Sequence, residues 1–480
     1  RVAGRDDWVY ADNQARTVAE ATDFAIWIDD DPPPAWTREA VTYHIFVDRF
    51  YPGDGKPWLK PKDLSGAFGG TLRGVIQKLD DIESLGFNAL WLSPVFASPP
   101  VHGYHATDLY TVEPRLGTNA DLKELIEALH ARGMRLILDF VANHWSDQHP
   151  TFLSAQSDPS SPYRDWYIWN HWPDDYETYF GVRELPQLNL KPGLARDYML
   201  ECAHYWLREG VDGYRLDYAY GPPHDFWSDF RRACRAARPD CWLFGEVIHS
   251  AAVQLSYAGR LDGTLDFLLA RALRETFAHR TWSLAQFESF LSAHDAYFPY
   301  SFSRPSFLDN HDMNRILFAA GEDKARVRLG ALVLFTLSGP PIVYYGTEAG
   351  VTQERPIHQN DFGIFEEARL PMKWGDEQDA SLAEYFRRLG ALRRDHLVLH
   401  RGSRRAVHLD AGAGTYAYLR EAGPQRALVA LNAGDVPRML TLPVSGLSPS
   451  AKDLLNGNKV RVDDVGVEIS LPAQSGAFIA

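Results

Sequence analysis

The chain of 480 residues has a formal charge of −14 and is 45% hydrophobic, so it can form a large folded core with accessory domains. The acidic balance excludes the basic clusters that nucleic-acid binding requires, and no apolar run approaches the roughly 20 residues of a membrane span. We therefore expect a soluble protein with neither a nucleic-acid nor a membrane partner.

The chain has three cysteines, and their spacing matches no zinc-binding pattern. We expect buried thiols, and we expect no organic cofactor. No signal peptide is visible, which favours the cytoplasm and leaves a secreted or periplasmic location open. The sequence does not indicate an oligomeric state.

The first 38 residues are polar and contain a proline-rich stretch, "DDDPPPAW", at 29–36. Consecutive prolines stiffen a chain, so we interpret this stretch as a linker. We expect residues 1–38 to be an N-terminal segment, the remnant of a β-domain, and residues 39–397 to form the catalytic domain.

Short apolar runs alternate with helical patterns along this catalytic region. One helix is predicted over 119–133, with Asn119 as its cap and Gly133 as its stop. Strands that alternate with helices predict a parallel sheet, and eight such units make a (β/α)8 TIM barrel. The eight expected strands cover residues 41–47, 88–95, 135–141, 213–218, 241–247, 263–268, 305–310 and 341–345.

Two segments depart from this rhythm. Residues 142–190 form a long excursion after the third strand, which we expect to be an inserted domain B. Residues 398–480 change to short β-like runs separated by turns, which predicts a C-terminal antiparallel β-sandwich.

The excursion contains an aromatic stretch, "YRDWYIWNHWPDDYETYF", at 163–180. Flat rings beside hydrogen-bonding groups suit the apolar faces and hydroxyl rims of sugars, although a self-packed aromatic loop is an equal alternative. We expect one or two of Trp166, Trp169 and Trp172 to contact a substrate and the rest to pack inside the excursion.

Polar residues lie where the predicted strands end. In "GYRLDYAY" (213–220), Arg215 and Asp217 occupy the strand face opposite Tyr214 and Leu216. Active sites of such barrels lie at the carboxyl ends of the strands, so these side chains should converge there. The converging set is His144, Arg215, Asp217, Glu246, His311 and Asp312.

Paired carboxylates on one rim fit the cleavage of glycosidic bonds. That reaction needs an acid to protonate the leaving oxygen and a carboxylate to attack or stabilise the anomeric carbon. Arg215 would hold Asp217 ionised and oriented.

Four strings, in order, resemble the conserved regions of the α-amylase family of glycoside hydrolases: "DFVANH" (139–144), "GYRLDYAY", "GEVI" (245–248) and "FLDNHD" (307–312). The resemblance implies Asp217 as nucleophile, Glu246 as acid/base and Asp312 as the carboxylate that stabilises the transition state. It also implies the barrel, the inserted domain B and the β-sandwich.

The same resemblance implies that several residues bind the sugar. Tyr104 would stack on the ring of the attacked sugar, and Arg215 would line its subsite. The expected substrate-binding set is Tyr104, His144, Arg215, His311, His102 and Arg315.

"VTYHIFVDRFYPGD" (41–54) and "FGEVIHS" (244–250) look most similar to the branch of cyclomaltodextrinase, neopullulanase and maltogenic amylase. His105 stands where relatives that remove single glucose units carry an aspartate. "YAYGPPHD" (218–225) lacks the Lys-His pair of many α-amylases, so the leaving-group side is expected to be rebuilt.

A calcium ion is expected near Asn143, which resembles a calcium-binding asparagine of the family. A second calcium site around Asp54 is not expected, because Pro52 and Thr71 stand where branch relatives offer Asn and Asp.

These patterns predict a retaining α-glucan hydrolase that cleaves α-1,4-glucosidic bonds in malto-oligosaccharides or cyclodextrins through a covalent glycosyl-enzyme. A glucanotransferase or sugar isomerase with the same triad is the alternative. A non-catalytic scaffold protein fits poorly, because such family members have a membrane span and lack the catalytic carboxylates.

Overall fold

The computed structural model describes residues 31–193, 195–357 and 365–480. Eight parallel strands form one sheet in the order β10-β9-β8-β5-β2-β1-β12-β11. The N–H of Thr264 donates to Ser303 O at 3.2 Å and that of Asp266 to Pro305 O at 2.8 Å, which joins the two end strands and closes the TIM barrel. The strands are β1 Thr42–Ile45, β2 Ala89–Leu92, β5 Arg135–Val141, β8 Gly213–Asp217, β9 Trp242–Gly245, β10 Gly263–Thr264, β11 Ser306–Phe307 and β12 Pro341–Tyr344.

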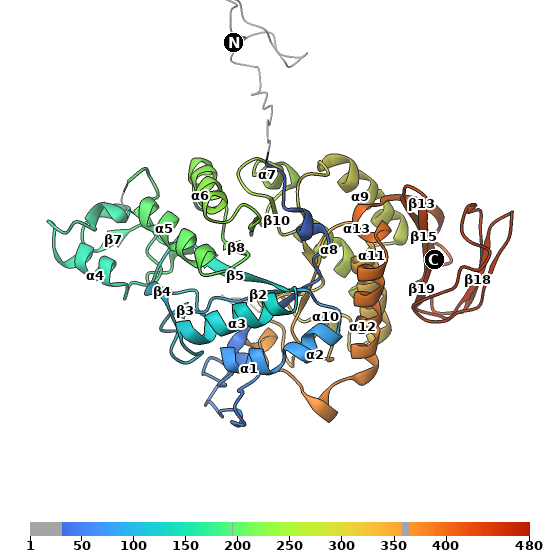
Figure 1. The fold of residues 1–480 in the computed structure, drawn as a ribbon, viewed down its shortest axis with the longest axis horizontal. Helices are drawn as coiled ribbons and strands as arrows, with labels where there is room; N and C mark the ends of the chain where they lie inside the picture. Colours follow the sequence, from blue (N-terminus) through green and yellow to red (C-terminus); the bar gives the residue numbers. More distant parts are fainter. Residues whose placement is uncertain (1–30, 194, 358–364) are drawn as a thin grey trace, which may run out of the picture. The chain divides into compact units, whose positions relative to one another are not determined.

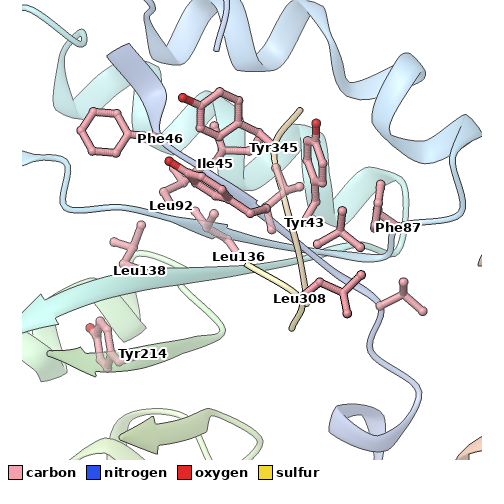
Figure 2. Close-up of a cluster of buried hydrophobic side chains, with 14 of the residues drawn as sticks. Tyr43, Ile45, Phe46, Phe87, Leu92, Leu136, Leu138, Tyr214, Leu308 and Tyr345 are labelled. Carbon is pink, nitrogen blue, oxygen red and sulfur yellow. The ribbon is translucent and has the colours of Figure 1, made fainter. Parts of the chain in front are cut away.

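All eight lie inside the predicted ranges, so the predicted barrel is confirmed. Their side chains alternate between two cores, as the period of two in a strand requires. Figure 2 shows outward-facing residues of one core, among them Tyr43, Ile45, Leu92, Leu138 and Tyr214. The intervening positions fill the barrel interior with Trp91, Ile137, Trp242, Phe244 and Ile342.

Helices surround the strands (Figure 1). The cap of α3 differs from the prediction: Thr118, not Asn119, accepts the N–H of Asp121 in a capping box, while the Asn119 amide bonds the backbone of Val112 and Tyr110. The helices are α1 Leu72–Gln77, α2 Leu79–Ser84, α3 Asn119–Ala131, α4 Pro150–Ser157, α5 Ala195–Arg208, α6 His224–Ala237, α7 Ala251–Leu255, α8 Phe267–Leu273, α9 Leu284–Tyr297, α10 Ile316–Ala319, α11 Lys324–Thr336, α12 Ala380–Asp395 and α13 Val398–Arg401.

Two irregular insertions rise from the carboxyl ends of the strands. The hairpin β3 (Phe96–Ala97) and β4 (Asp108–Val112) follows β2, and the predicted excursion lies between β5 and α5. The excursion holds α4, the short strands β6 (Trp169–His171) and β7 (Asp175–Tyr176), and a helical turn at Tyr179–Gly181.

The C-terminal strands form the predicted antiparallel sandwich. One sheet has the order β13-β14-β15-β19 and the other β16-β18-β17. The first sheet packs one face on the second sheet and the other on the barrel helices, where the Tyr418 hydroxyl lies 2.5 Å from that of Thr336 on α11. The strands are β13 Ser403–Asp410, β14 Thr415–Ala422, β15 Gln425–Asn432, β16 Arg438–Leu442, β17 Val460–Val462, β18 Val467–Leu471 and β19 Ser475–Ile479.

The end of the expected N-terminal segment 1–38 packs on the barrel. Trp36 lies edge-on to Trp242, with ring centroids 5.6 Å apart, and its indole N–H donates to Asp240 O at 2.9 Å. This part of the expected linker is therefore packed on the barrel. Of the expected β-domain remnant at 1–38, residues 1–30 lie outside the described residues.

Candidate active site

Arg215 is the centre of the site. It lies inward on β8 and pairs in register with Asp139 on β5. Its Nη1 donates to Asp139 Oδ1 at 2.7 Å and to Asp217 Oδ1 at 2.8 Å, and its Nη2 lies 2.8 Å from Glu246 Oε1. The two predicted catalytic carboxylates thus share one buried guanidinium with a third carboxylate, Asp139, which the sequence interpretation left without a role.

This crowding affects protonation. Burial raises the pKa of Asp217 well above its ordinary value, and Arg215 opposes the rise. Burial likewise raises the pKa of Asp139. Three carboxylates share one guanidinium, and at Asp217 burial outweighs Arg215, contrary to the expectation that Arg215 holds this carboxylate ionised.

Asp312 has a different environment. Its Oδ2 lies 3.0 Å from His311 Nε2, and its Oδ1 accepts from Arg369 Nη2 at 2.8 Å. Burial alone would raise the pKa of Asp312, but His311 and Arg369 outweigh burial and hold it well below its ordinary value. Asp312 therefore remains ionised. Arg369 was missed because it lies 57 residues further along the chain, and no motif marks it.

Tyr104 contacts both groups of carboxylates, through Asp139 beside Arg215 and through His311 beside Asp312. Its hydroxyl lies 3.2 Å from Asp139 Oδ2 and 2.5 Å from His311 Nε2, and its ring is parallel to that of His311 with centroids 5.5 Å apart. His102 accepts the Tyr104 N–H at 3.2 Å and packs against its ring. The structure thus brings His102, Tyr104 and His311 together beside Asp312.

His144 follows β5 and is 1% exposed. Burial lowers the pKa of His144 to about 3, with His105 adding to the effect, so the imidazole is neutral. Its Nε2 has no hydrogen-bond partner among the described residues. A buried ring nitrogen without a partner is suited to a ligand hydroxyl.

Arg315 is placed differently from its prediction as a substrate-binding residue. It is 0% exposed, its Nε donates to Ala368 O at 2.8 Å and its Nη1 to Tyr345 O at 2.5 Å. The guanidinium also lies 4.0 Å from the ring centroid of Tyr344. Arg315 holds the backbone below the site and is not free to reach a sugar.

The aromatic residues beside the carboxylates are not the predicted tryptophans. Trp169 and Trp172 donate their indole N–H groups to Arg164 O and Ala155 O, within the excursion. Tyr179 instead lies 4.6 Å from the His144 ring, and Phe180 is 61% exposed. These two rings are the aromatic contribution of the excursion to the site. Within the aromatic stretch, no sequence signal separates them from the tryptophans.

Asn143, where the sequence predicts calcium, lies between the His144 ring and Gly221. Its amide lies 3.3 Å from the His144 ring, and a Cβ at Gly221 would come 2.1 Å from its oxygen. Among the described residues, no group of three or more His, Cys, Asp or Glu side chains could hold a metal ion. Calcium requires six or more oxygens, so a calcium ion here remains a prediction and no step below depends on it.

The region of Asp54 is organised by other bonds. The Asp54 carboxylate accepts from Gln77 Nε2 at 2.8 Å and lies 4.0 Å from Arg73 Nε. Thr71 caps α1 and donates to Pro52 O at 2.8 Å. The expectation that no calcium binds here remains a prediction.

An eight-stranded parallel barrel with acidic residues clustered at the carboxyl ends of its strands is typical of a glycoside hydrolase. Residues 44–389 match the family description "Alpha amylase, catalytic domain". The chain belongs to the α-amylase family, and it is a glycoside hydrolase of that family.

Known relatives agree with this assignment. Alpha-amylase 2 of Dictyoglomus thermophilum is 38% identical over 433 residues, which cover 90% of this chain and 75% of the relative. A cyclomaltodextrinase of a Bacillus species is 32% identical, with 87% and 77% covered. A solved cyclomaltodextrinase structure superposes with a TM-score of 0.85 at 29% identity, covering 93% of this chain and 79% of that one. The predicted family and branch are confirmed.

A search of the described helices for a membrane span finds none: each is too short or too polar to cross a bilayer.

Proposed function

We propose that this chain is a retaining hydrolase of α-glucans that cleaves α-1,4-glucosidic bonds in malto-oligosaccharides or cyclodextrins. The observation that carries the proposal is the placement of Asp217 and Glu246 on one guanidinium, each 2.8 Å from an Arg215 nitrogen. Two carboxylates on one guanidinium support the proposal of a nucleophile and an acid that act together in a double displacement.

In the first step, Asp217 attacks the anomeric carbon while Glu246 protonates the leaving glycosidic oxygen. A covalent glycosyl-enzyme forms and the leaving sugar departs with a free hydroxyl. In the second step, Glu246 removes a proton from water, and the water oxygen displaces Asp217. Two inversions leave the product in the α configuration.

The surrounding residues bind and orient the sugar. Asp312, held ionised by His311 and Arg369, accepts hydrogen bonds from sugar hydroxyls and stabilises the positive charge that develops on the ring. The neutral His144 offers Nε2 to another hydroxyl, and Tyr104 supplies a ring face for stacking.

The substrate class rests on the relatives. An α-amylase and a cyclomaltodextrinase are among them, and both names refer to α-linked glucose polymers. A neutral glucan also suits a chain with a net charge of −14, because it needs no basic surface for capture. A cytoplasmic location remains a prediction.

The decisive experiment is the product profile on maltoheptaose, β-cyclodextrin, pullulan and soluble starch, with the first product anomer followed by proton NMR. An α anomer and shorter oligosaccharides are expected. Initial β product would overturn the retaining mechanism.

Chains longer than maltoheptaose would instead support the alternative of a glucanotransferase. That reaction uses the same intermediate and differs only in whether a sugar or water accepts the glycosyl group. Transfer to a different hydroxyl of the same sugar would indicate an isomerase.

A further inference from the structure

Tyr218, which follows Asp217, has an unusual backbone. Its φ is 40°, in the left-handed region that bulky residues rarely adopt. Phe180 of the excursion has a φ of 48°, and the two rings touch with centroids 5.1 Å apart. Strained residues cluster where the surrounding structure enforces a functional geometry.

The consequence of this conformation is a hydrogen bond to Glu246. The backbone N–H of Tyr218 donates to Glu246 Oε2 at 3.1 Å, while Glu246 Oε1 lies 2.8 Å from Arg215 Nη2. The next N–H, of Ala219, donates to Glu246 O at 3.0 Å. Two successive N–H groups converge on one glutamate, and a left-handed residue provides the turn that this requires.

Neighbouring rings hold Tyr218 in place. Tyr179 lies edge-on to it with ring centroids 4.9 Å apart, and Phe180 covers it at a tilt. On another side, a Cβ at Gly221 would come 2.7 Å from the Tyr218 ring, so only glycine allows this approach. The ring is therefore confined by the excursion and by its own loop.

We propose that Tyr218 is a positioning residue for Glu246: the contacts of its ring with Tyr179 and Phe180 maintain the left-handed backbone that points its N–H at the acid. This inference rests on the proposed role of Glu246 as proton donor. The excursion would thereby influence the orientation of Glu246. The Tyr218 ring would act through its own backbone N–H and would not need to contact the sugar.

The test compares Tyr218→Gly with Tyr218→Ala. Glycine adopts a positive φ freely and keeps the N–H, whereas alanine loses the ring and does not favour that conformation. On maltotriose we expect kcat of Tyr218→Gly to stay within roughly threefold of wild type, and that of Tyr218→Ala to fall on the order of tenfold or more. Tyr218→Phe, which keeps the ring, should match wild type.

The second substrate is α-glucosyl fluoride, whose leaving group needs little protonation. Here kcat/KM of Tyr218→Ala, which reports the formation of the glycosyl-enzyme, should fall less than about threefold, because fluoride needs little protonation in that step. Equal losses for the glycine and alanine variants on maltotriose, with a raised KM, would overturn the proposal and indicate direct contact with the sugar. A loss by the alanine variant that is as large on the fluoride as on maltotriose would also overturn it.

Phe180→Ala gives a second readout, since Phe180 contacts the ring of Tyr218. It should reproduce the substrate-dependent loss of Tyr218→Ala in weaker form; unchanged kcat on maltotriose would exclude the coupling. Glu246→Gln separates the two hypotheses: equal loss on both substrates would refute the acid role itself.

Discussion

At the scale of single residues, the three site carboxylates differ in what surrounds them. Asp217 and Glu246 share Arg215 with Asp139, whereas Asp312 has His311 and Arg369. In the first group three carboxylates share one guanidinium, whereas Asp312 has two basic side chains beside it. His311 and Arg369 keep Asp312 an anion, whereas at Asp217 burial outweighs the attraction of Arg215.

Substituting the two catalytic carboxylates should therefore have separable effects. Asp217→Asn should abolish nearly all turnover of every substrate, because no glycosyl-enzyme can form. Glu246→Gln should lower kcat/KM on maltotriose by roughly 10²–10⁴-fold and lower kcat/KM on α-glucosyl fluoride much less, because the first step with fluoride needs little protonation. Steady-state kinetics on both substrates measure this. Comparable activity of Asp217→Asn and wild type would refute the nucleophile assignment.

Glu348 is a buried carboxyl that the proposed mechanism does not use. The Tyr43 hydroxyl donates to its Oε1 at 2.6 Å, and burial raises the pKa of Glu348 from 4.5 to about 7. Because the folded state holds this proton more tightly than the unfolded chain does, its contribution to stability is full below pH 4.5. That contribution falls as pH rises towards 7.

We expect Glu348→Gln to remove this contribution, because glutamine keeps an acceptor and does not ionise. The free energy of unfolding, measured in urea, should then decline less between pH 5 and 7 than that of wild type, by about 2 kcal/mol. Identical slopes for the two proteins would show that Glu348 is ionised with an ordinary pKa in the folded state.

At the scale of elements, the excursion combines a packed interior with a face at the site. Trp169 stacks on Phe152 with centroids 5.8 Å apart and meets Tyr176 edge-on, so it belongs to the interior. Tyr179 and Phe180 meet Tyr218 at the carboxyl end of β8. The same stretch thus contributes to stability and to the site through different residues.

Trp169→Ala should accordingly lower stability and leave substrate preference unchanged. We expect a loss of about 2–4 kcal/mol, since the ring is partly buried and its N–H donor is also removed. The ratio of KM for maltoheptaose to KM for maltotriose should stay at the wild-type value. A changed ratio with unaltered urea unfolding would instead show that Trp169 contacts the substrate.

At the scale of the whole molecule, two buried arginines lie near the junction of barrel and sandwich, where Arg420 Nη2 also donates to Ser338 Oγ at 2.8 Å. Arg393 on α12 donates to Leu337 O at 2.7 Å and Gly339 O at 2.9 Å, and Arg420 on β14 donates to Gly402 O at 2.7 Å. Burial lowers the pKa of Arg393 to about 9, with Arg420 adding to the effect, and burial lowers the pKa of Arg420 to about 10. Backbone carbonyls solvate both cations.

Replacing Arg420 by methionine should destabilise this junction. The variant keeps the buried stem but leaves several carbonyls without a donor, at an expected cost of about 3–5 kcal/mol. Thermal unfolding followed by circular dichroism should show a lower Tm. Arg461→Met, at a side chain 72% exposed, is the matched control and should change Tm little. Equal Tm values for both variants would contradict the role of Arg420.

The sequence by itself determined the barrel, the sandwich and the positions of Asp217, Glu246 and Asp312. These depend on local patterns: the period of two along a strand sends Arg215 and Asp217 inward and Tyr214 outward, and parallel strands bring their ends to one rim.

Only the tertiary structure decided how these residues are supported. Arg369 reaches Asp312 from a distant segment, Arg315 is enclosed by carbonyls, and Phe180 rather than a tryptophan faces Tyr218. Such contacts join parts of the chain that no local pattern relates. Packing between elements determines which side chains meet. Each ring occupies a space that its neighbours leave open, and each guanidinium lies beside polar atoms that need a hydrogen-bond partner.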